Sequence, residues 1–188
     1  MTDDRILLIT GPAGAGKSSV AEAWAASRDF GCAQLSLDTF REFVKTGYHD
    51  PRNGWNDEAQ RQLDLARSNM AAVAMNYLSS DIQVVIDDAV FPNWEAVGLD
   101  GWNEALPGID IDLVVLMPDW SVVLERNAGR DDQRRVPEDI LRVIYDDMAG
   151  WRDRAGVSVI DNSGMTVAET VVAVERVAAG GSGTSAAG

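Results

Sequence analysis

The sequence predicts an α/β fold in which a parallel sheet of five strands is covered by helices on both faces. Five short apolar runs lie at residues 5–10, 33–37, 84–86, 113–117 and 157–160. The first and fourth runs do not alternate between apolar and polar residues, so both faces of these strands should be buried. Longer stretches with helical spacing separate the runs, and strands that alternate with helices build parallel sheets.

Composition indicates a globular protein and excludes several classes of partner. The chain has 188 residues, of which 46% are hydrophobic and 24% charged, which excludes a mostly disordered chain. We expect one domain over residues 1–179 and a flexible Gly- and Ser-rich tail over 180–188. With 30 acidic and 16 basic residues, the net charge is -14. This charge argues against extended nucleic acid and anionic membranes as partners.

The chain also predicts a cytoplasmic location. Cys32 is the single cysteine, so no intrachain disulfide can form, as is common in a reducing compartment. The N-terminus has no signal-peptide pattern, and no apolar run approaches the ~20 residues of a membrane span. The oligomeric state is left open.

In the first half of the chain, a glycine-rich loop follows the first strand, and residues 17–27 are predicted to be a helix. Asp38 follows the second strand and can cap a short helix. Residues 47–57 are polar and rich in turn formers. A long helix is predicted over 56–78 because its apolar residues recur at three-and-four spacing.

In the second half, the third strand ends in two consecutive aspartates. Residues 91–108 are predicted to hold one short helix within loops. Two helices, over 119–127 and 137–151, flank an arginine-rich loop, and the last helix covers 166–179. Because ligands of such sheets bind beyond the carboxyl ends of the strands, functional residues should gather there.

The loop GPAGAGKS matches G-x-x-x-x-G-K-[ST] in full, between a predicted strand and a predicted helix. Its glycines let backbone N–H groups surround phosphate oxygens, and the helix N-terminus adds positive charge. Lys17 can reach the β- and γ-phosphates, and the Ser18 hydroxyl can ligate Mg²⁺. The alternative is a chance match in a Gly- and Ala-rich chain. The predicted phosphate-binding residues are Gly11, Ala13, Gly14, Ala15, Gly16, Lys17, Ser18 and Ser19.

Three carboxylates are candidates for the chemistry. Asp87 ends an apolar strand, so we assign it to water on the metal ion, and we assign its neighbour Asp88 to the acceptor because strand neighbours point opposite ways. A solvent-facing strand end is the alternative. Asp38, in LSLDTFRE, can accept the proton of an attacking hydroxyl or hold that hydroxyl in line; alternatively it only caps a helix. Arg41 is predicted to pair with Asp38, to bind the acceptor or to lie at the surface.

Four arginines fall within ten residues of this acidic chain: Arg126, Arg130, Arg134 and Arg135. Guanidinium groups suit the charge of a transferring phosphoryl group. We therefore predict a mobile flap over about residues 126–136 that closes over the nucleotide. The alternative is a solvated helix whose arginines pair with neighbouring acids.

Other candidates lie at the two ends of the site. Asn162 follows the fifth strand, where it either meets the nucleotide base or forms a turn. Trp55, Phe91, Trp94 and Trp102 lie in segments predicted to roof the acceptor pocket. There they can stack on a planar substrate, the alternative being ordinary packing.

The motifs GPAGAGKS, LSLDTFR, VVIDD, ERNAGRDDQRR and VSVIDNSG occur in an order that resembles the small P-loop kinases of the nucleoside-monophosphate-kinase-like group. Within it, residues 5–179 are most similar to the chloramphenicol phosphotransferase-like, zeta-toxin-like and AAA_33-type kinases. The resemblance implies a three-layer P-loop NTPase fold with strand order 2-3-1-4-5. It also implies that Asp38 activates the acceptor, that Arg130 and Arg134 are the catalytic cations of the flap, and that Arg126 lies near adenine.

The predicted function is therefore ATP- and Mg²⁺-dependent transfer of a γ-phosphate to a hydroxyl group of a small molecule, with an antibiotic as one candidate acceptor. A nucleoside or sugar-nucleotide kinase is the alternative enzyme. An ATP-binding switch is the alternative of another class. A GTPase switch is disfavoured because the chain's two lysines, at positions 17 and 45, cannot supply an N-K-x-D guanine motif.

Overall fold

The computed structural model of the chain describes residues 5–51, 54–132 and 134–180. Its sheet is parallel, in the order β2-β3-β1-β4-β5, which confirms the predicted order. The strands are β1 (Arg5–Thr10), β2 (Cys32–Ser36), β3 (Gln83–Asp87), β4 (Asp110–Leu116) and β5 (Ser158–Ile160). Apart from Gly180, the predicted tail lies outside the described residues.

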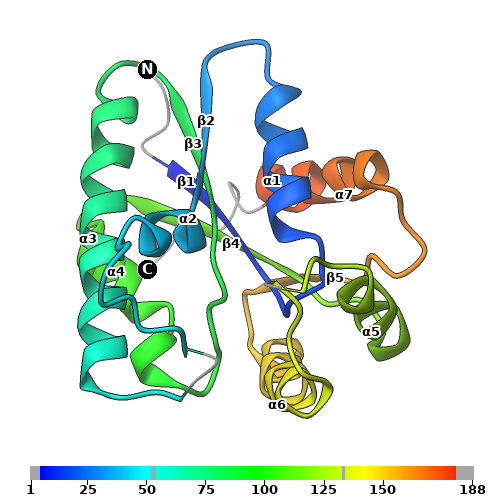
Figure 1. The fold of residues 1–188 in the computed structure, drawn as a ribbon. Coiled ribbons are helices and arrows are strands. Elements are labelled where there is room, and N and C mark those ends of the chain that lie inside the picture. Colours follow the sequence, from blue (N-terminus) through cyan, green and yellow to red (C-terminus); the bar gives the residue numbers. More distant parts are fainter. Residues whose placement is uncertain (1–4, 52–53, 133, 181–188) are drawn as a thin grey trace.

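Both faces of the sheet are covered by helices, as the absence of alternation predicts. In β1, Ile6 and Leu8 belong to the core on one face, and Leu7 and Ile9 to the core on the other. The first face packs against α3 (Asp57–Leu78), α4 (Asp100–Ala105) and α6 (Glu138–Met148), and the second against α1 (Lys17–Ala26) and α7 (Val167–Gly180). Figure 1 shows α1 and α7 on one side of the strands and α3 and α4 on the other.

The short helix α2 (Leu37–Glu42) begins two residues earlier than a cap at Asp38 allows. Leu37 is buried and starts the helix, and Ser36 is its N-cap. Asp38 is therefore the second helical residue, and the prediction that it caps the helix is wrong. Residue 37, which was predicted to end the second strand, is therefore the first residue of the helix.

The arginine-rich segment is only partly helical. Helix α5 (Trp120–Ala128) ends with Gly129 as its C-cap, so Arg130 and Arg134 lie in the loop that follows. These arginines therefore do not share a helix face with Arg126, and the alternative of one solvated helix is wrong. The loop leads directly into α6.

The remaining boundaries follow the predicted pattern closely. The Asn56 side chain accepts a hydrogen bond from the Ala59 N–H at 2.9 Å and caps α3. The segment predicted to hold one short helix contains α4 and a turn of 3-10 helix, η2 (Glu95–Val97), and a second such turn, η3 (Ala149–Asp153), follows α6. In the described part of the chain, none of the helices has the length and apolar character that crossing a membrane requires.

Candidate active site

The phosphate-binding loop leaves β1 and leads into α1 at the centre of the sheet's carboxyl edge. Gly11 and Gly14 have φ values of 145° and 86°, in the region that favours glycine. A Cβ on Gly11 would lie 2.1 Å from the Leu116 carbonyl oxygen, and one on Gly14 would lie 2.8 Å from that of Val123. Glycine is therefore required at both positions because β4 and α5 approach the loop so closely.

The first turn of α1 is suited to bind an anion. Its N-cap is Gly16, whose backbone has a left-handed conformation. Because glycine has no side chain, the N-cap makes no side-chain hydrogen bond to the first backbone N–H groups. Ser18 and Ser19 are exposed in the turn that follows. Backbone N–H groups at a helix N-terminus, together with the helix dipole, attract phosphate.

Lys17 is partly buried and its ammonium group lies back along the loop. Its Nζ donates to the carbonyl oxygens of Gly11 at 2.8 Å and Pro12 at 3.2 Å. Both acceptors belong to the loop itself. The ammonium group is thus held beside the place where the loop would surround a phosphate.

Charged residues from three separate segments act on Lys17. Burial lowers the pKa of Lys17, whereas the charges of Asp38, Asp87 and Asp88 raise it and that of Arg130 lowers it. These residues come from α2, from the end of β3 and from the loop after α5. The fold therefore brings together charged residues that are far apart in the sequence.

Asp87 is buried and its carboxylate is held by three donors. Its Oδ1 accepts hydrogen bonds from Ser18 Oγ at 2.8 Å and Ser36 Oγ at 3.2 Å, and its Oδ2 accepts one from Gln34 Nε2. Hydroxyl and carboxylate oxygens are the hard ligands that Mg²⁺ prefers. The donor set of Ser18 and Asp87 therefore fits the predicted magnesium ion, with Gln34 and Ser36 orienting the carboxylate.

Asp88 has different surroundings. Its Oδ2 accepts a hydrogen bond from Trp102 Nε1 at 2.8 Å, and Arg67 Nη2 lies 3.7 Å from the same oxygen. Burial raises the pKa of Asp88, while Arg67 and Trp102 lower it. Trp102 is fully buried, so its packing is that of a core residue. Acceptor binding by Asp88 stays a prediction.

Helix α2 carries an exposed carboxylate, Asp38, and a buried guanidinium group, that of Arg41. Asp38 is exposed, and its charge raises the pKa of Lys17, Asp88 and Tyr48. Arg41, one turn further on, is 7% exposed, so the alternative of a surface position is wrong. Arg41 Nε and Nη2 have no hydrogen-bond partner among the described residues, and neither therefore bonds to Asp38.

Asn162 and Arg126 lie against the phosphate-binding loop. Asn162 is buried, and its Nδ2 donates to the Ala15 carbonyl oxygen at 3.0 Å. Arg126 Nη2 donates to the Asn162 carbonyl oxygen at 3.2 Å, and its Cβ is 3.6 Å from where a Cβ on Gly14 would lie. Both residues are therefore placed beside the loop, where a nucleotide is predicted, and base binding by them stays a prediction.

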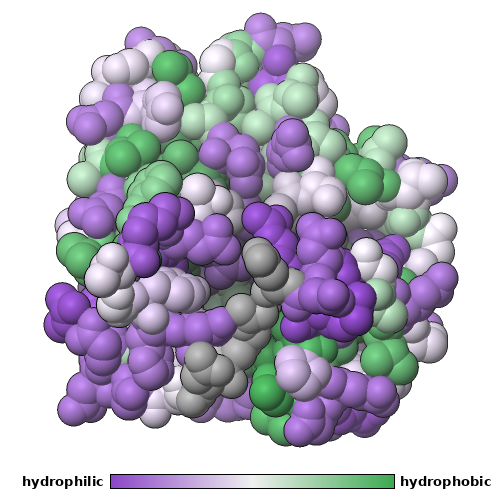
Figure 2. Space-filling view, in the orientation of Figure 1, coloured by the Kyte–Doolittle hydropathy of each residue, from purple (hydrophilic) through white to green (hydrophobic). Residues whose placement is uncertain are grey.

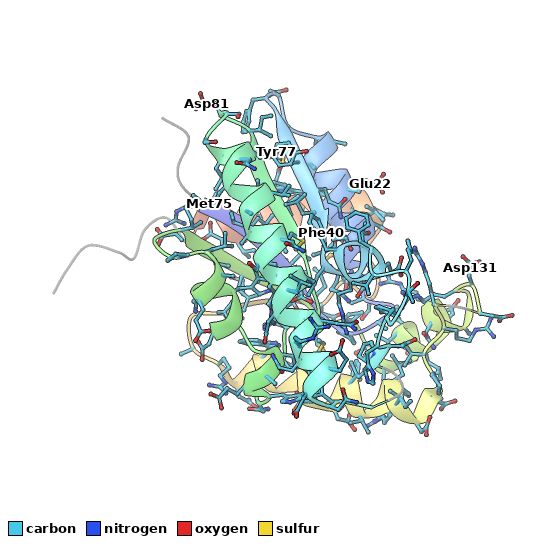
Figure 3. The ribbon with its side chains drawn as sticks, turned by 60° about the vertical axis from the view of Figure 1, so that its left-hand side comes forward. Glu22, Phe40, Met75, Tyr77, Asp81 and Asp131 are labelled. Carbon is cyan, nitrogen blue, oxygen red and sulfur yellow. The ribbon has the colours of Figure 1, made fainter. Side chains whose placement is uncertain are left out.

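The arginines of the predicted flap differ in their exposure and in their charged partners. Arg130 is partly buried and acts on Lys17, whereas Arg134 is exposed. Arg135 pairs with Asp132 at 3.1 Å. Figure 3 shows Asp131, which lies in the loop that follows α5, at the outer edge of the molecule. Figure 2 shows hydrophilic side chains over this loop and over α2.

Asn127 connects the two ends of the predicted flap. The sequence patterns did not indicate this residue. Its side chain is buried, with Nδ2 donating to the Val136 carbonyl oxygen at 2.8 Å and Oδ1 accepting from the Val136 N–H at 3.1 Å. The amide therefore pairs with Val136 as a second peptide group would. Asn127 and Gly129 near the end of a helix indicate a turn, but the pairing of Asn127 with Val136, nine residues away, depends on the fold.

Aromatic residues of the predicted acceptor side meet in the structure. The rings of Trp55 and Trp94 are 4.9 Å apart, and those of Phe91 and Trp94 are 5.7 Å apart. Phe91 and Trp94 also line a cavity of about 530 Å³ together with Trp151 and Arg154. Stacking of Trp55 or Phe91 on a substrate stays a prediction.

Comparison with known families decides the relationship. The family model described as AAA domain (AAA_33) matches residues 6–155, well over half of the chain. The protein belongs to the AAA_33 family. The match covers the phosphate-binding loop, Asp38, Asp87 and the flap, and it confirms the predicted resemblance. It ends before Asn162.

Solved structures similar to this AAA_33 protein include two kinases and a resistance protein. A gluconokinase from Sinorhizobium meliloti 1021 has a TM-score of 0.66 at 20% identity, covering 99% of this chain and 100% of that one. The tunicamycin resistance protein of Deinococcus radiodurans has 0.65 at 18%, covering 94% of each chain. Shikimate kinase from Acinetobacter baumannii, solved with shikimate, has 0.62 at 20%, covering 94% and 93%.

At these identities the likenesses establish the fold, which this AAA_33 protein shares with P-loop small-molecule kinases. No match to a curated protein sequence is significant.

Proposed function

We propose that this AAA_33 protein is an ATP-dependent kinase that transfers the γ-phosphoryl group to a hydroxyl group of a small molecule. The proposal rests on the gathering of Asp38, Asp87 and Arg130 around Lys17. It assigns the activity to one domain over residues 1–179, with a flap over about 126–136, and to the cytoplasm, where ATP is available.

In the proposed reaction, the hydroxyl oxygen of the acceptor bonds to the γ-phosphorus as the bond from that phosphorus to the β–γ bridging oxygen breaks. ADP leaves, and the hydroxyl proton passes to the Asp38 carboxylate. The exposure of Asp38 and the effect of its charge on Lys17 support this role, since a carboxylate near the phosphates can orient a hydroxyl there. Catalysis then consists mainly of positioning and electrostatic stabilisation.

The remaining residues hold the nucleotide. Lys17 and the loop N–H groups would bind its phosphates, Ser18 would ligate Mg²⁺, and Asp87 would hold a water on the ion. The ion would supply positive charge that stabilises the phosphates. Arg130 and Arg134 stabilise the transferring group, while Arg126 and Asn162 contact the base.

Nucleotide binding is tested by titration calorimetry with a nonhydrolysable ATP analogue in the presence of Mg²⁺. We expect Lys17→Ala to abolish turnover and to weaken analogue binding, since it removes the cation that reaches the phosphates. Lys45→Ala, which removes an exposed lysine, is the matched control. An analogue that does not bind the wild type would refute the proposal.

The assignment of Asp38 is tested with a pool of hydroxylated antibiotics, nucleosides and sugar acids as acceptors and γ-labelled ATP. Asp38→Asn should lower transfer by a factor on the order of 10² to 10⁴ while leaving analogue binding nearly unchanged. Glu42→Gln, the same change at an exposed position of α2, should keep full activity. An active Asp38→Asn enzyme would exclude Asp38 as the base, and slow hydrolysis without any acceptor would favour an ATP-binding switch.

A further inference from the structure

Gln62 is a buried polar residue that the proposed reaction does not use. It lies in the second turn of α3, and only 4% of it is exposed. A buried amide destabilises the fold unless its N–H and C=O groups have hydrogen-bond partners. The partners of Gln62 therefore show which part of the structure this residue holds.

Gln62 bonds to the backbone on both sides of Tyr48. Its Oε1 accepts a hydrogen bond from the His49 N–H at 2.9 Å, and its Nε2 donates to the Gly47 carbonyl oxygen at 2.7 Å. Gly47 has a φ value of 78°, in the region that favours glycine, so the chain turns directly before Tyr48. The two bonds fix the backbone of Tyr48 to α3, the helix that packs against α2.

Glu58 determines which way the amide of Gln62 faces. The Glu58 carboxylate accepts hydrogen bonds from Gln62 Nε2 at 2.6 Å and from Arg61 Nη2 at 2.7 Å. The bonds from Arg61 and Gln62 lower the pKa of Glu58 to about 2, so this group is an acceptor only at physiological pH. A rotated amide would direct its oxygen at this carboxylate. The nitrogen of Gln62 therefore faces Gly47 and Glu58, and its oxygen faces His49.

The side chain of Tyr48 lies near the proposed base. Burial raises the pKa of Tyr48, and the charge of Asp38 raises it further whereas that of Arg41 lowers it. The charge of Asp38 also acts on Lys17 of the phosphate-binding loop. Tyr48 is 38% exposed, so a ligand can reach its ring. Because the phenol stays protonated at physiological pH, it presents an O–H donor beside an apolar ring.

We infer that Tyr48 binds the acceptor through its phenol O–H, and that Gln62 is the positioning residue that holds Tyr48 in place. This inference rests on the proposed kinase function and narrows its substrate class. Asp38 orients one hydroxyl group while Tyr48 donates to another oxygen, so the acceptor is an alcohol with at least one further oxygen atom. A backbone fixed before the acceptor binds reduces the ordering cost of binding.

The role of Tyr48 is tested by transfer from γ-labelled ATP to the pooled antibiotics, nucleosides and sugar acids. Tyr48→Phe should raise the KM of the phosphorylated acceptor about two- to tenfold, the effect of one hydrogen bond, and leave the KM of ATP unchanged. Tyr77→Phe is the matched control, because Tyr77 is 37% exposed and lies roughly 22 Å along α3 from Gln62. An acceptor KM that stays at the wild-type value in Tyr48→Phe would overturn the inference.

The role of Gln62 is tested by a double-mutant cycle. Gln62→Met fills similar space without the amide and should raise the acceptor KM about as much as Tyr48→Phe does. In a Tyr48→Ala background it should have no further effect, since Gln62 acts through Tyr48. Gln60→Met, on the same helix, removes bonds to Asp64 and Ala96 instead and is the control. Effects of Gln62→Met and Tyr48→Ala that multiply would exclude the positioning role.

Amide hydrogen exchange tests the contact without an acceptor. The His49 N–H should exchange at least about tenfold faster in Gln62→Met than in the wild type, whereas Tyr48→Phe should retain the protection. Urea unfolding of each variant distinguishes this local loss from a loss of global stability. Equal exchange in Gln62→Met and the wild type would contradict the inference.

Transfer assays separate this inference from the proposed function. Phosphorylation with the same acceptor KM in wild type, Tyr48→Phe and Gln62→Met would keep the kinase and overturn the inference alone. A monohydric alcohol without a second oxygen, phosphorylated as efficiently as the pooled acceptors, would have the same meaning. A wild-type protein that transfers phosphate to no alcohol would refute the kinase and the acceptor site together.

Discussion

Asp87 and Asp88 are adjacent in the sequence but differ at the scale of single residues. Asp87 accepts a hydrogen bond from Ser18 of the phosphate-binding loop. Asp88 accepts one from Trp102 and lies near the buried Arg67. Neighbours along a strand point to opposite faces, which agrees with one carboxylate bonding to the phosphate-binding loop and the other to the buried Trp102.

This difference predicts unequal effects of two matched substitutions. Asp87→Asn should weaken Mg²⁺-dependent binding of an ATP analogue by about tenfold or more, since an amide is a poorer partner for metal-bound water. Asp88→Asn should change that binding little and instead destabilise the fold by up to about 3 kcal/mol, because Arg67 loses its anion. Calorimetry with and without Mg²⁺ and urea unfolding measure both effects. Equal Mg²⁺ dependence in the two variants would contradict the assignment of the metal side to Asp87.

At the scale of elements, Asn127 and Val136 connect the two ends of the predicted flap. Asn127, the next-to-last residue of α5, bonds to both backbone groups of Val136, so the intervening loop leaves and returns at one point. Arg130 lies in this loop and acts on Lys17. If the loop moves as the predicted flap, we expect these two bonds to limit how far its arginines can move from the phosphate-binding loop.

We expect Asn127→Ala to loosen the flap, since it leaves the buried N–H and C=O groups of Val136 without partners at a cost of about 1–3 kcal/mol. Trypsin should then cleave after the flap arginines roughly tenfold faster, and transfer activity should fall more than nucleotide affinity. Asn69→Ala, at an exposed position of α3, is the control. Cleavage at the wild-type rate would show that Asn127 does not hold the flap.

At the scale of the whole molecule, the phosphate-binding loop joins parts that are far apart in the chain. It approaches the end of β4 at Leu116, helix α5 at Val123, and the segment after β5 at Asn162. A ligand bound by this loop therefore stabilises both cores of the sheet at once.

Binding of Mg²⁺ and an ATP analogue should raise the stability of the whole domain. At about 100 times the dissociation constant, the gain should be about 2.7 kcal/mol, seen as one cooperative transition at a higher temperature. Lys17→Ala should lose most of this shift at the same ligand concentration, and Lys45→Ala should retain it. A shift of equal size in Lys17→Ala would mean that the analogue binds elsewhere.

Local patterns in the sequence were sufficient to predict the layers, the strand positions and the phosphate-binding loop. Runs such as 5–10 are apolar on both faces because both faces are buried. The positive φ values of Gly11 and Gly14 are a property of a few consecutive residues, whereas the close approach of β4 and α5 to these glycines depends on the fold. Resemblance to known kinases predicted the strand order, and the structure confirms it.

Contacts between distant segments were decided by the tertiary structure alone. The burial of Arg41, the bond from Trp102 to Asp88, and the bonds from Asn127 to Val136 all depend on partners or packing beyond the local sequence. The helix start at Leu37, with Ser36 rather than Asp38 as the N-cap, was likewise not predicted from the local sequence. Periodicity and motifs report the conformation of neighbours along the chain, whereas burial and pairing depend on which surfaces the folded sheet brings together.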